Sequence, residues 1–423
     1  MENNICVGID IGTTKVTALV AKKLEEGKLE IIAVGKAPSY GVVRGQVQNI
    51  RQTQEAIEKA VSMAEAASGL SIDEVYVGIA GSHIRSSQQM HVINMEEPNT
   101  DITEDEVQRL TREMYNTAVG PDERIIHVLP QEYAIDGQTN ILEPVGCMGS
   151  RLSANFHVIT GKIQAAKMIE ESVKRANLTL KNLVLEPIAS SAAVLSEKEK
   201  KAGVVLVDIG GGTTDIAIFH NNVIRHSAVI PFGGQVITND IQQGCQILEE
   251  QAEKLKTKFG AAIAVDSAKN QVVSIPRVSG GQPRQISVRT LSEIIQCRMG
   301  EIFELVDGEI RASGYHGRLH AGIVLTGGGS KLRHISQLAE YKTGIDARVG
   351  EPIERLANNF DADLRHPLFA TGIGLCEMGF RFEESNVTSQ KRKFKLLPGW
   401  MKDGFNDLNL KEILLGGPEH DDF

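Results

Sequence analysis

Two short stretches of the sequence combine aspartate, glycine and threonine in nearly the same order. The first reads DIGTTK from Asp10, and the second reads DIGGGTTD from Asp208. In both, an apolar run ends in the aspartate, and a second apolar run follows the Gly/Thr turn. Glycine lets the backbone approach an anion and supplies positive φ, while turn amides and threonine hydroxyls donate to phosphate oxygens. An aspartate at the strand end can hold Mg²⁺, commonly through water.

The spacing of the two copies further supports phosphate binding. The aspartates are 198 positions apart (208 − 10), about the length of one domain. A single Gly-Thr-Thr turn is usually an ordinary hairpin and gives weak support for phosphate binding. Two copies at domain spacing instead predict two hairpins that face each other across a cleft and bind one triphosphate from both sides.

A third glycine-rich stretch reads GIVLTGGGS over residues 322–330. It predicts a strand that runs into a glycine loop and then a helix, so a base or a phosphate could lie against the loop near a helix N-terminus. A plain strand-to-helix connection is the alternative. The sequence lacks both the P-loop spacing and a GxGxxG that opens a βαβ unit, which argues against P-loop and dinucleotide-binding proteins.

Apolar periodicity predicts the elements that position these stretches. Each Asp-Gly-Thr turn lies in a meander of three strands, and residues 82–160 form a separate small α/β insertion whose helix starts with a capping box at Thr103 and Glu106. The predicted strands are Ile5–Asp10, Val16–Ala21, Leu29–Lys36, Val75–Ala80, Met90–Asn94, Ile125–Leu129, Tyr133–Ile135, Asn155–Thr160, Leu183–Glu186, Val204–Asp208, Asp215–Phe219, Asn222–Ile230 and Ile323–Leu325. The predicted helices cover 53–67, 162–176, 234–244, 248–259, 290–312 and about 367–378, with a linker after Phe382.

Composition limits the classes of function. The chain has 423 residues and a formal net charge of −9, so it can form two lobes, and we expect no nucleic acid partner. Its five cysteines are scattered, and His316 and His320 lie in a glycine-containing loop, so neither disulfides nor a zinc site are predicted. Without a signal peptide or a bilayer-spanning apolar run, we expect a cytoplasmic protein with peripheral membrane contact.

Five segments, in order, resemble the signature segments of the superfamily of actin, heat-shock chaperones and sugar kinases. They are DIGTTK, LEPIASS from Leu185, VDIGGGTTD, GIVLTGGGS and PLFATGIG from Pro367. Within that superfamily the chain looks like the FtsA family of bacterial cell division proteins over about residues 1–380. The resemblance implies an α/β, two-lobed, actin-like (ribonuclease H-like) ATPase fold with a small α/β subdomain inserted in the first lobe.

The resemblance also implies a site for ATP and Mg²⁺. Asp10 and Asp208 would organise the metal, mainly through water, and Glu186 would position the attacking water. Glu253 and Lys256, which share a helix face, would contact ribose and adenine. The other residues implied in nucleotide binding are Gly12, Thr13, Thr14, Lys15, Gly210, Gly211, Gly212, Thr213, Thr214, Gly327, Gly328 and Gly329. Without the motifs around them, Glu186 would be interpreted as a solvated carboxylate, and the Glu253–Lys256 pair as a surface ion pair.

The predicted domain organisation follows the same resemblance. The first-lobe core (1A) takes residues 1–81, 161–200 and 362–382, and the inserted subdomain (1C) takes 82–160. The second-lobe core (2A) takes 201–245 and 318–361, and subdomain 2B takes 246–317. Residues 383–423 are predicted to be a linker and a membrane-targeting tail.

Resemblance to FtsA implies a protein that tethers the FtsZ ring to the inner face of the cytoplasmic membrane at the division site, polymerises and recruits later division proteins. Nucleotide would act mainly as a switch, with at most slow hydrolysis. The 176 residues between Asp10 and Glu186 (186 − 10) leave room for the insertion. A small-metabolite (sugar or polyol) kinase of the same superfamily is the alternative, although no catalytic aspartate of a sugar cleft can be located.

Two further stretches resemble partner-binding parts of FtsA. Residues 292–306 resemble the helix that receives the C-terminal peptide of FtsZ, with Arg298 and Glu301 as predicted contacts. The core face of that helix is predicted to comprise Ile294, Ile295, Ile302, Leu305 and Val306. In the tail, an interfacial membrane helix is predicted from apolar side chains at helical intervals among lysines. They are Phe394, Leu397, Met401, Phe405 and Leu408, and Trp400 beside them is also predicted to contact the membrane. Pro398 interrupts this stripe and the chain ends in acidic residues, so a disordered tail is the alternative.

Overall fold

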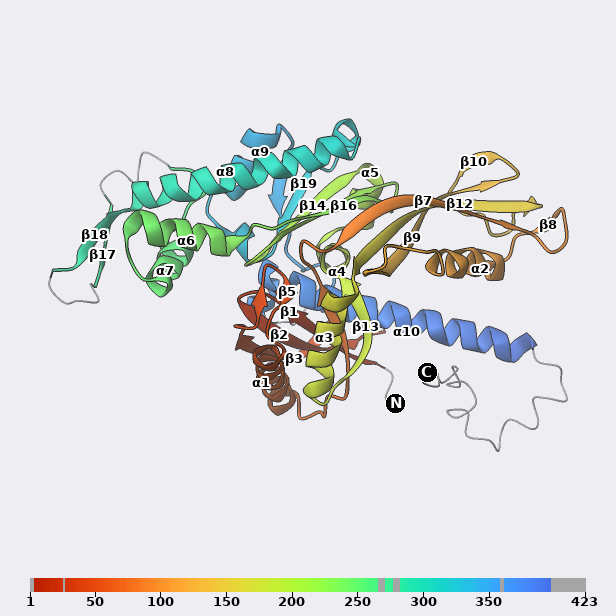
Figure 1. The fold of residues 1–423 in the computed structure, drawn as a ribbon, viewed down its shortest axis with the longest axis horizontal. Coiled ribbons are helices and arrows are strands. Elements are labelled where there is room, and N and C mark those ends of the chain that lie inside the picture. The colour runs from red at the N-terminus through yellow and green to blue at the C-terminus, as the bar shows by residue number, and fades with distance from the viewer. Residues whose placement is uncertain (1–3, 26, 265–270, 277–281, 358–360, 397–423) are drawn as a thin grey trace. The chain divides into compact units, whose positions relative to one another are not determined.

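Two five-stranded sheets with the same topology form the body of residues 4–379 (Figure 1). The computed structural model describes residues 4–25, 27–264, 271–276, 282–357 and 361–396, with side chains as far as 384. The first sheet has the order β13-β6-β1-β2-β3 and the second the order β20-β19-β14-β15-β16. In each sheet three antiparallel strands form a meander and the other two continue it in parallel. The sequence repeat therefore belongs to a duplicated sheet.

The strand bounds are close to those expected from the periodicity. The first sheet contains β1 (Ile5–Ile11), β2 (Lys15–Lys23), β3 (Leu29–Pro38), β6 (Glu74–Ile79) and β13 (Thr179–Leu185). The second contains β14 (Val204–Ile209), β15 (Thr214–His220), β16 (Val223–Ile230), β19 (Ile323–Thr326) and β20 (Ala347–Val349). Two-stranded ribbons are formed by β4 (Val42–Val43) with β5 (Gln46–Val47) and by β17 (Val272–Ile275) with β18 (Arg284–Ser287).

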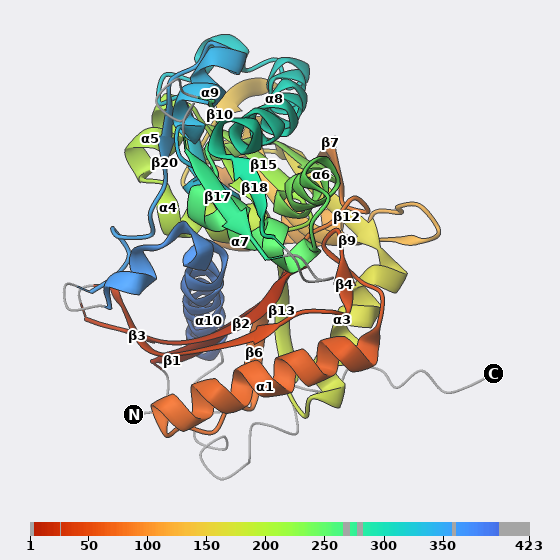
Figure 2. The ribbon, with the colours of Figure 1, turned by 90° about the vertical axis from the view of Figure 1, so that its left-hand side faces the viewer.

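Helices cover both faces of the first sheet (Figure 2). On one face lie α1 (Ile50–Ser68) and α3 (Ile163–Arg175), and their apolar sides share a core with the sheet. On the other face lie the first turns of α10 (Ala370–Leu396), so close that a Cβ on Gly8 would be 2.9 Å from the carbonyl oxygen of Gly372. Coverage of both faces explains why β1 is an almost unbroken apolar run.

The second sheet packs against α6 (Gly234–Cys245), α7 (Glu249–Phe259), α8 (Val288–Ala312) and α9 (Ile335–Thr343) around one hydrophobic core. The short helices α4 (Glu186–Val194) and α5 (Glu197–Ala202) connect the lobes, and α4 contacts strands of both sheets. Four 3₁₀ turns complete the described chain. They are η2 (His316–Arg318), η3 (Gly328–Lys331), η4 (Ala362–Arg365) and η5 (Pro367–Phe369).

The predicted insertion has its own sheet, with the order β10-β9-β12-β7, and its own core. It contains β7 (Arg85–Asn94), β8 (Thr100–Asp101), α2 (Glu104–Tyr115), β9 (Glu123–Ile135), β10 (Gln138–Ile141), β11 (Met148–Gly149) and β12 (Arg151–Lys162). The predicted capping interaction is confirmed, because the backbone N–H of Thr103 donates to the Glu106 carboxylate at 2.8 Å. The α/β fold class with its inserted subdomain is therefore confirmed.

Two local predictions were wrong, whereas the predicted order of strand, glycine loop and helix is confirmed by β19, by the Gly-rich loop that forms the 3₁₀ turn η3, and by α9, which begins at Ile335. Helix α10 continues to Leu396 and does not give way to a linker after Phe382, because no glycine or proline occurs between Phe380 and Leu396. On α8, Leu305 is 45% exposed and does not belong to the core face, while Ile295, Ile302 and Val306 are fully buried.

Candidate functional site

A cavity of about 550 Å³ lies between the two sheets and is lined by the Gly/Thr turns of both. Of the residues predicted to bind nucleotide or metal, all except Thr214 line it: Asp10, Gly12, Thr13, Thr14, Lys15, Glu186, Asp208, Gly210, Gly211, Gly212, Thr213, Glu253, Lys256, Gly327, Gly328 and Gly329. The prediction for Thr214 was wrong. Its side chain is fully buried, and its hydroxyl donates to the Phe232 carbonyl at 2.8 Å.

The two turns have the same internal geometry. The backbone N–H of Gly12 donates to the Lys15 carbonyl at 2.9 Å, and that of Gly210 donates to the Thr213 carbonyl at the same distance. Strand register makes Asp10 equivalent to Asp208, since each stands two residues before its turn glycine. The register thus confirms that the sequence repeat is a structural one.

The tips of the two turns contact each other at glycines. A Cβ on Gly211 would lie 2.8 Å from Cγ2 of Thr14, and one on Gly212 would overlap the Thr13 hydroxyl. In neither turn does a glycine have positive φ, whereas Gly327 in the third loop has φ of 78°. The expectation of positive φ was therefore wrong for both hairpins. Gly211 and Gly212 are needed instead because the backbone of the second turn lies against the threonine side chains of the first.

Four carboxyl groups line the cavity close to one another. They belong to Asp10, Glu186, Asp208 and Asp215. Asp208 is buried and accepts hydrogen bonds from the Ser190 hydroxyl at 2.5 Å and the Thr371 hydroxyl at 3.3 Å. Asp215 is 2% exposed, and only its Oδ2 has a partner, the Thr213 hydroxyl at 2.8 Å. Its Oδ1 has none among the described residues.

Burial raises the pKa of each of these carboxyl groups. It raises the pKa of Asp10 to about 6 against the attraction of Lys15, with repulsion from Asp208 adding to the rise. Burial and then repulsion from Asp208 raise the pKa of Asp215 to about 7. Burial followed by the charge of Asp10 raises the pKa of Glu186 well above its usual range. Such a cluster is costly to keep charged, and a cation would stabilise it.

Replacing Asp215 with asparagine should therefore raise the melting temperature of the nucleotide-free protein at pH 8 in EDTA. The folded-state pKa is about 7 and the unfolded one about 3.9, so this group's contribution to stability is greatest below pH 4 and falls as the pH rises to 7. We expect a gain of roughly 1–3 kcal/mol at pH 8 that vanishes near pH 4. An equal gain at both pH values, or a similar one from the exposed control Asp101→Asn, would contradict this.

Lys15 is the cation at the carboxylate cluster. Its ammonium donates to the Leu368 carbonyl at 3.1 Å and lies 5.7 Å from the centre of the Phe369 ring. Burial lowers its pKa to about 8, although Asp10 attracts the charge. The segment before α10 thus holds a first-lobe lysine over the site. Burial and then the charge of Lys331 lower the pKa of His366, which also lines the cavity, to about 4.

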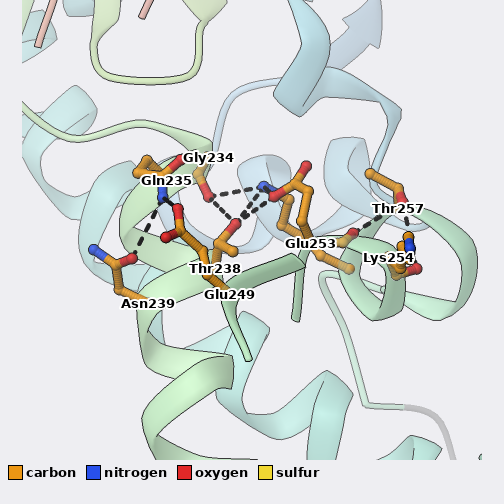
Figure 3. A network of polar contacts seen from close by, with 9 residues as sticks. Gly234, Gln235, Thr238, Asn239, Glu249, Glu253, Lys254 and Thr257 are labelled. Carbon is orange, nitrogen blue, oxygen red and sulfur yellow. Dashed lines mark hydrogen bonds and ion pairs between the residues drawn. The ribbon is translucent and has the colours of Figure 1, made fainter. Parts of the chain in front are cut away.

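The second lobe adds a polar network between α6 and α7 (Figure 3). The Lys256 ammonium donates to the Gly234 carbonyl at 2.9 Å and to the Thr238 hydroxyl at 2.8 Å, and it pairs with Glu253 at 2.7 Å. The first turn of α6 is tied to the Gly/Thr turn, because the N–H of Gly234 donates to the Gly210 carbonyl at 2.9 Å. Glu253 and Lys256 thus face the cavity, and are not an isolated surface pair.

The donors in the cavity suit a triphosphate with Mg²⁺. Turn amides without a Cβ, the hydroxyls of Thr13 and Thr14 and the Lys15 ammonium can donate to phosphate oxygens. Carboxylate oxygens are the ligands that Mg²⁺ prefers. The unpartnered Oδ1 of Asp215 is a buried acceptor that such an ion, or its water, could satisfy.

Several lining residues were missed by the sequence analysis, among them Gly45, Asp215, Gly234, Arg333, His366 and Thr371. Two of them lie within segments that resemble the superfamily, since Asp215 ends VDIGGGTTD and Thr371 lies in PLFATGIG. Asp215 could have been found by pairing the two strands of the second hairpin, which places it directly opposite Asp208. The other four, Gly45, Gly234, Arg333 and His366, line the cavity only because distant parts of the chain fold together.

The predicted FtsZ contacts lie outside the cavity. Arg298 on α8 makes two hydrogen bonds to Asp240 on α6, at 2.6 and 3.1 Å, and one to Glu301 at 2.5 Å. Of the predicted membrane residues, Phe394 lies in α10 but its side chain is not described, and Leu397, Trp400, Met401 and Phe405 lie outside the described residues. Within the described part of the chain, no helix is both long enough and apolar enough to cross a membrane.

Solved structures share this fold at low sequence identity. A chain of the PilM–PilN type IV pilus biogenesis complex matches with a TM-score of 0.61 and 16% identity over 89% of this chain and 98% of its own. MreB5 of Spiroplasma citri bound to ADP matches with a TM-score of 0.56 and 14% identity over 92% and 99%. The duplicated sheet and these structural matches define an actin-like fold.

Sequence comparisons show the family. The family model of the cell division protein FtsA matches residues 205–374, and that of the SHS2 domain inserted in FTSA matches residues 81–160. The cell division protein FtsA of Pseudomonas aeruginosa is 38% identical over 387 residues, 92% of each chain. That of Escherichia coli K12 is 34% identical over 412 residues, 95% of this chain and 96% of its own. The chain belongs to the FtsA family of cell division proteins.

Proposed function

We propose that this protein is a nucleotide-dependent switch of cell division, which binds ATP with Mg²⁺ between its lobes, polymerises and tethers FtsZ to the inner face of the cytoplasmic membrane. The observation that supports nucleotide binding most is that the Gly/Thr turns of both lobes line one cavity together with Asp10 and Asp208. Family membership supports the division role.

Within this site we assign roles by chemistry. Asp10 and Asp208 would hold Mg²⁺, mainly through water, and the turns Gly12–Lys15 and Gly210–Thr213 would bind the phosphates. Glu186 would orient a water molecule for slow hydrolysis, Glu253 and Lys256 would contact the nucleoside, and Gly327–Gly329 would lie against the base. When bound, Mg²⁺ would neutralise phosphate charge. The division of the lobes into 1A, 1C, 2A and 2B, with the bounds given above, is part of this proposal.

The proposed switch follows from contacts to both lobes. A ligand that touches Gly12–Lys15 and Gly210–Thr213 at once binds best when the two turns are close, so it favours the closed arrangement of the lobes. Polymer contacts and partner affinity would change with that arrangement. Turnover would be slow, since hydrolysis would serve only to reset the switch.

Partner binding is proposed at two places outside the cavity. The FtsZ peptide would bind along α8. The Arg298 guanidinium already pairs with both Asp240 and Glu301, so an acidic peptide would have to compete with Asp240 for it. The tail, with Phe394, Leu397, Trp400, Met401 and Phe405, would lie in the membrane interface among its lysines. Other division proteins would bind elsewhere on the polymer.

Co-sedimentation tests the division role. We expect the full chain to sediment with anionic lipid vesicles and to carry a labelled FtsZ C-terminal peptide with it, more strongly with Mg-ATP than without. Trp400→Glu should reduce vesicle binding several-fold, because it places a charge at the apolar interface, and should leave peptide binding in solution unchanged. Failure of the wild-type chain to bind either vesicles or peptide would contradict the tethering role.

The same preparation separates this role from the metabolite kinase alternative. A kinase would transfer phosphate from ATP to a sugar or polyol and would need neither vesicles nor FtsZ. We expect no transfer to such acceptors. Family membership and the inserted SHS2-type domain favour the division role.

A further inference from the structure

Thr238 lies at the centre of the network between α6 and α7 (Figure 3). Its hydroxyl oxygen is 2.5 Å from a carboxylate oxygen of Glu253, 2.8 Å from the Lys256 ammonium and 3.1 Å from the Gly234 carbonyl. The side chain is 1% exposed and does not itself line the cavity. We propose that Thr238 is a positioning residue that orients the Glu253–Lys256 pair toward the nucleoside end of the ligand, an inference that rests on the proposed nucleotide site.

The hydrogen-bond donors and acceptors of the three groups explain how Thr238 positions the pair. An ammonium only donates and a carboxylate only accepts, so the Thr238 hydroxyl accepts from Lys256 and gives its single proton to Glu253. Lys256 and Glu253 also pair directly at 2.7 Å. The three groups therefore form a closed triangle in which each fixes the rotamers of the others. A hydroxyl that only bonded its own helix at Gly234 would not link the two helices.

This triangle leaves one carboxylate oxygen of Glu253, Oε1, available to a ligand. The Glu253 side chain is 46% exposed, and only its Oε2 is engaged by Thr238 and Lys256. Among the described residues its Oε1 makes no hydrogen bond, and Glu253 lines the cavity. A carboxylate repels phosphate and accepts from hydroxyl and amino groups, so the part of a nucleotide that suits Oε1 is the nucleoside. Thr238 would thus act on the nucleoside and not on the phosphates.

A purely structural role of Thr238 would lead to a different result. Lys256 also donates to the Gly234 carbonyl, and the N–H of Gly234 donates to Gly210 in the Gly/Thr turn. If Thr238 mainly braced that turn, its removal would weaken binding of any polyphosphate. If it positions Glu253 and Lys256, its removal would weaken only ligands that carry the nucleoside.

The experiment compares Mg-ATP with Mg-tripolyphosphate by calorimetry on the full chain. Thr238→Val keeps the shape and removes the hydroxyl. We expect it to weaken ATP binding about tenfold, the size of one hydrogen bond to a charged group, and to leave tripolyphosphate binding unchanged. Thr238→Ser should restore ATP binding to near the wild-type value. Thr111→Val is the matched control, since the Thr111 hydroxyl bonds only its own helix, to the Val107 carbonyl at 2.9 Å on α2.

Each outcome distinguishes a role of Thr238 in positioning Glu253 and Lys256 from a role in bracing the Gly/Thr turn. Unchanged ATP affinity in Thr238→Val, or equal losses for ATP and tripolyphosphate, would overturn the positioning role while the nucleotide site stood. A wild-type chain that bound no ATP would overturn the proposed site and this inference together. Should Thr238→Val fail to fold in a thermal melt, Thr238→Ala, which places no methyl against the ammonium, is expected to show the same ATP-specific loss.

Discussion

Replacing Gly211 with glutamate is expected to abolish binding of Mg-ATP. A Cβ at this position would lie 2.8 Å from Cγ2 and 3.1 Å from Oγ1 of Thr14, at the contact between the two turns. Real Cβ atoms do not approach Cγ2 that closely, so Thr14 or one of the two turns would have to move. The added carboxylate would also repel phosphate within the proposed cradle. We expect an affinity loss of more than about a hundredfold by calorimetry.

The matched control lies on α8. A Cβ on Gly308 meets nothing within 4 Å, so Gly308→Glu introduces the same side chain without a clash and should bind ATP as the wild type does. Thermal melts of both variants distinguish loss of the site from loss of the fold. Wild-type affinity in Gly211→Glu would mean that the two turns do not bind the ligand together.

The second large effect is expected from Asp208→Asn. The substitution keeps the shape and can still accept from the hydroxyls of Ser190 and Thr371, which now hold the carboxylate. It removes the charge that would hold Mg²⁺. We expect Mg²⁺ to strengthen ATP binding at least tenfold in the wild type and to have no effect in the variant.

Ser190→Ala serves as the comparison for Asp208. It removes the hydrogen bond that orients the carboxylate but leaves the charge, so the gain in affinity from Mg²⁺ should be reduced and not lost. If Asp208→Asn kept the full Mg²⁺ dependence, the metal would have to be held elsewhere. Asp10, the other proposed ligand, would then hold it without Asp208, and Asp215 would be the next candidate because it lines the same cavity.

The paired turns could be predicted because their chemistry is local. An aspartate that ends an apolar strand and a Gly/Thr turn lie within a few residues of each other, and the same pattern recurs one domain later. The matching sheet topology follows from the same repeat. The role of the turn glycines was not predictable, since it depends on Thr13 and Thr14 of the other hairpin.

Other parts of the site depend on contacts that sequence patterns do not carry. Thr238 resembles any helical threonine until α7 places Glu253 and Lys256 against it. Leu305 fits the apolar stripe of α8 by spacing, yet it is 45% exposed. Arg298 was expected to be available to a partner, but Asp240 of α6 already pairs with it.

The central claim is that two acidic hairpins, one from each lobe, bind a single nucleotide and its metal. A crystal structure of the full chain with a non-hydrolysable ATP analogue and Mn²⁺ in place of Mg²⁺, with the metal located by its anomalous scattering, tests it most directly. We expect the metal beside Asp10 and Asp208, and the triphosphate in contact with both Gly12–Lys15 and Gly210–Thr213. A nucleotide that touched only one of these turns, or a metal bound away from both aspartates, would contradict the claim.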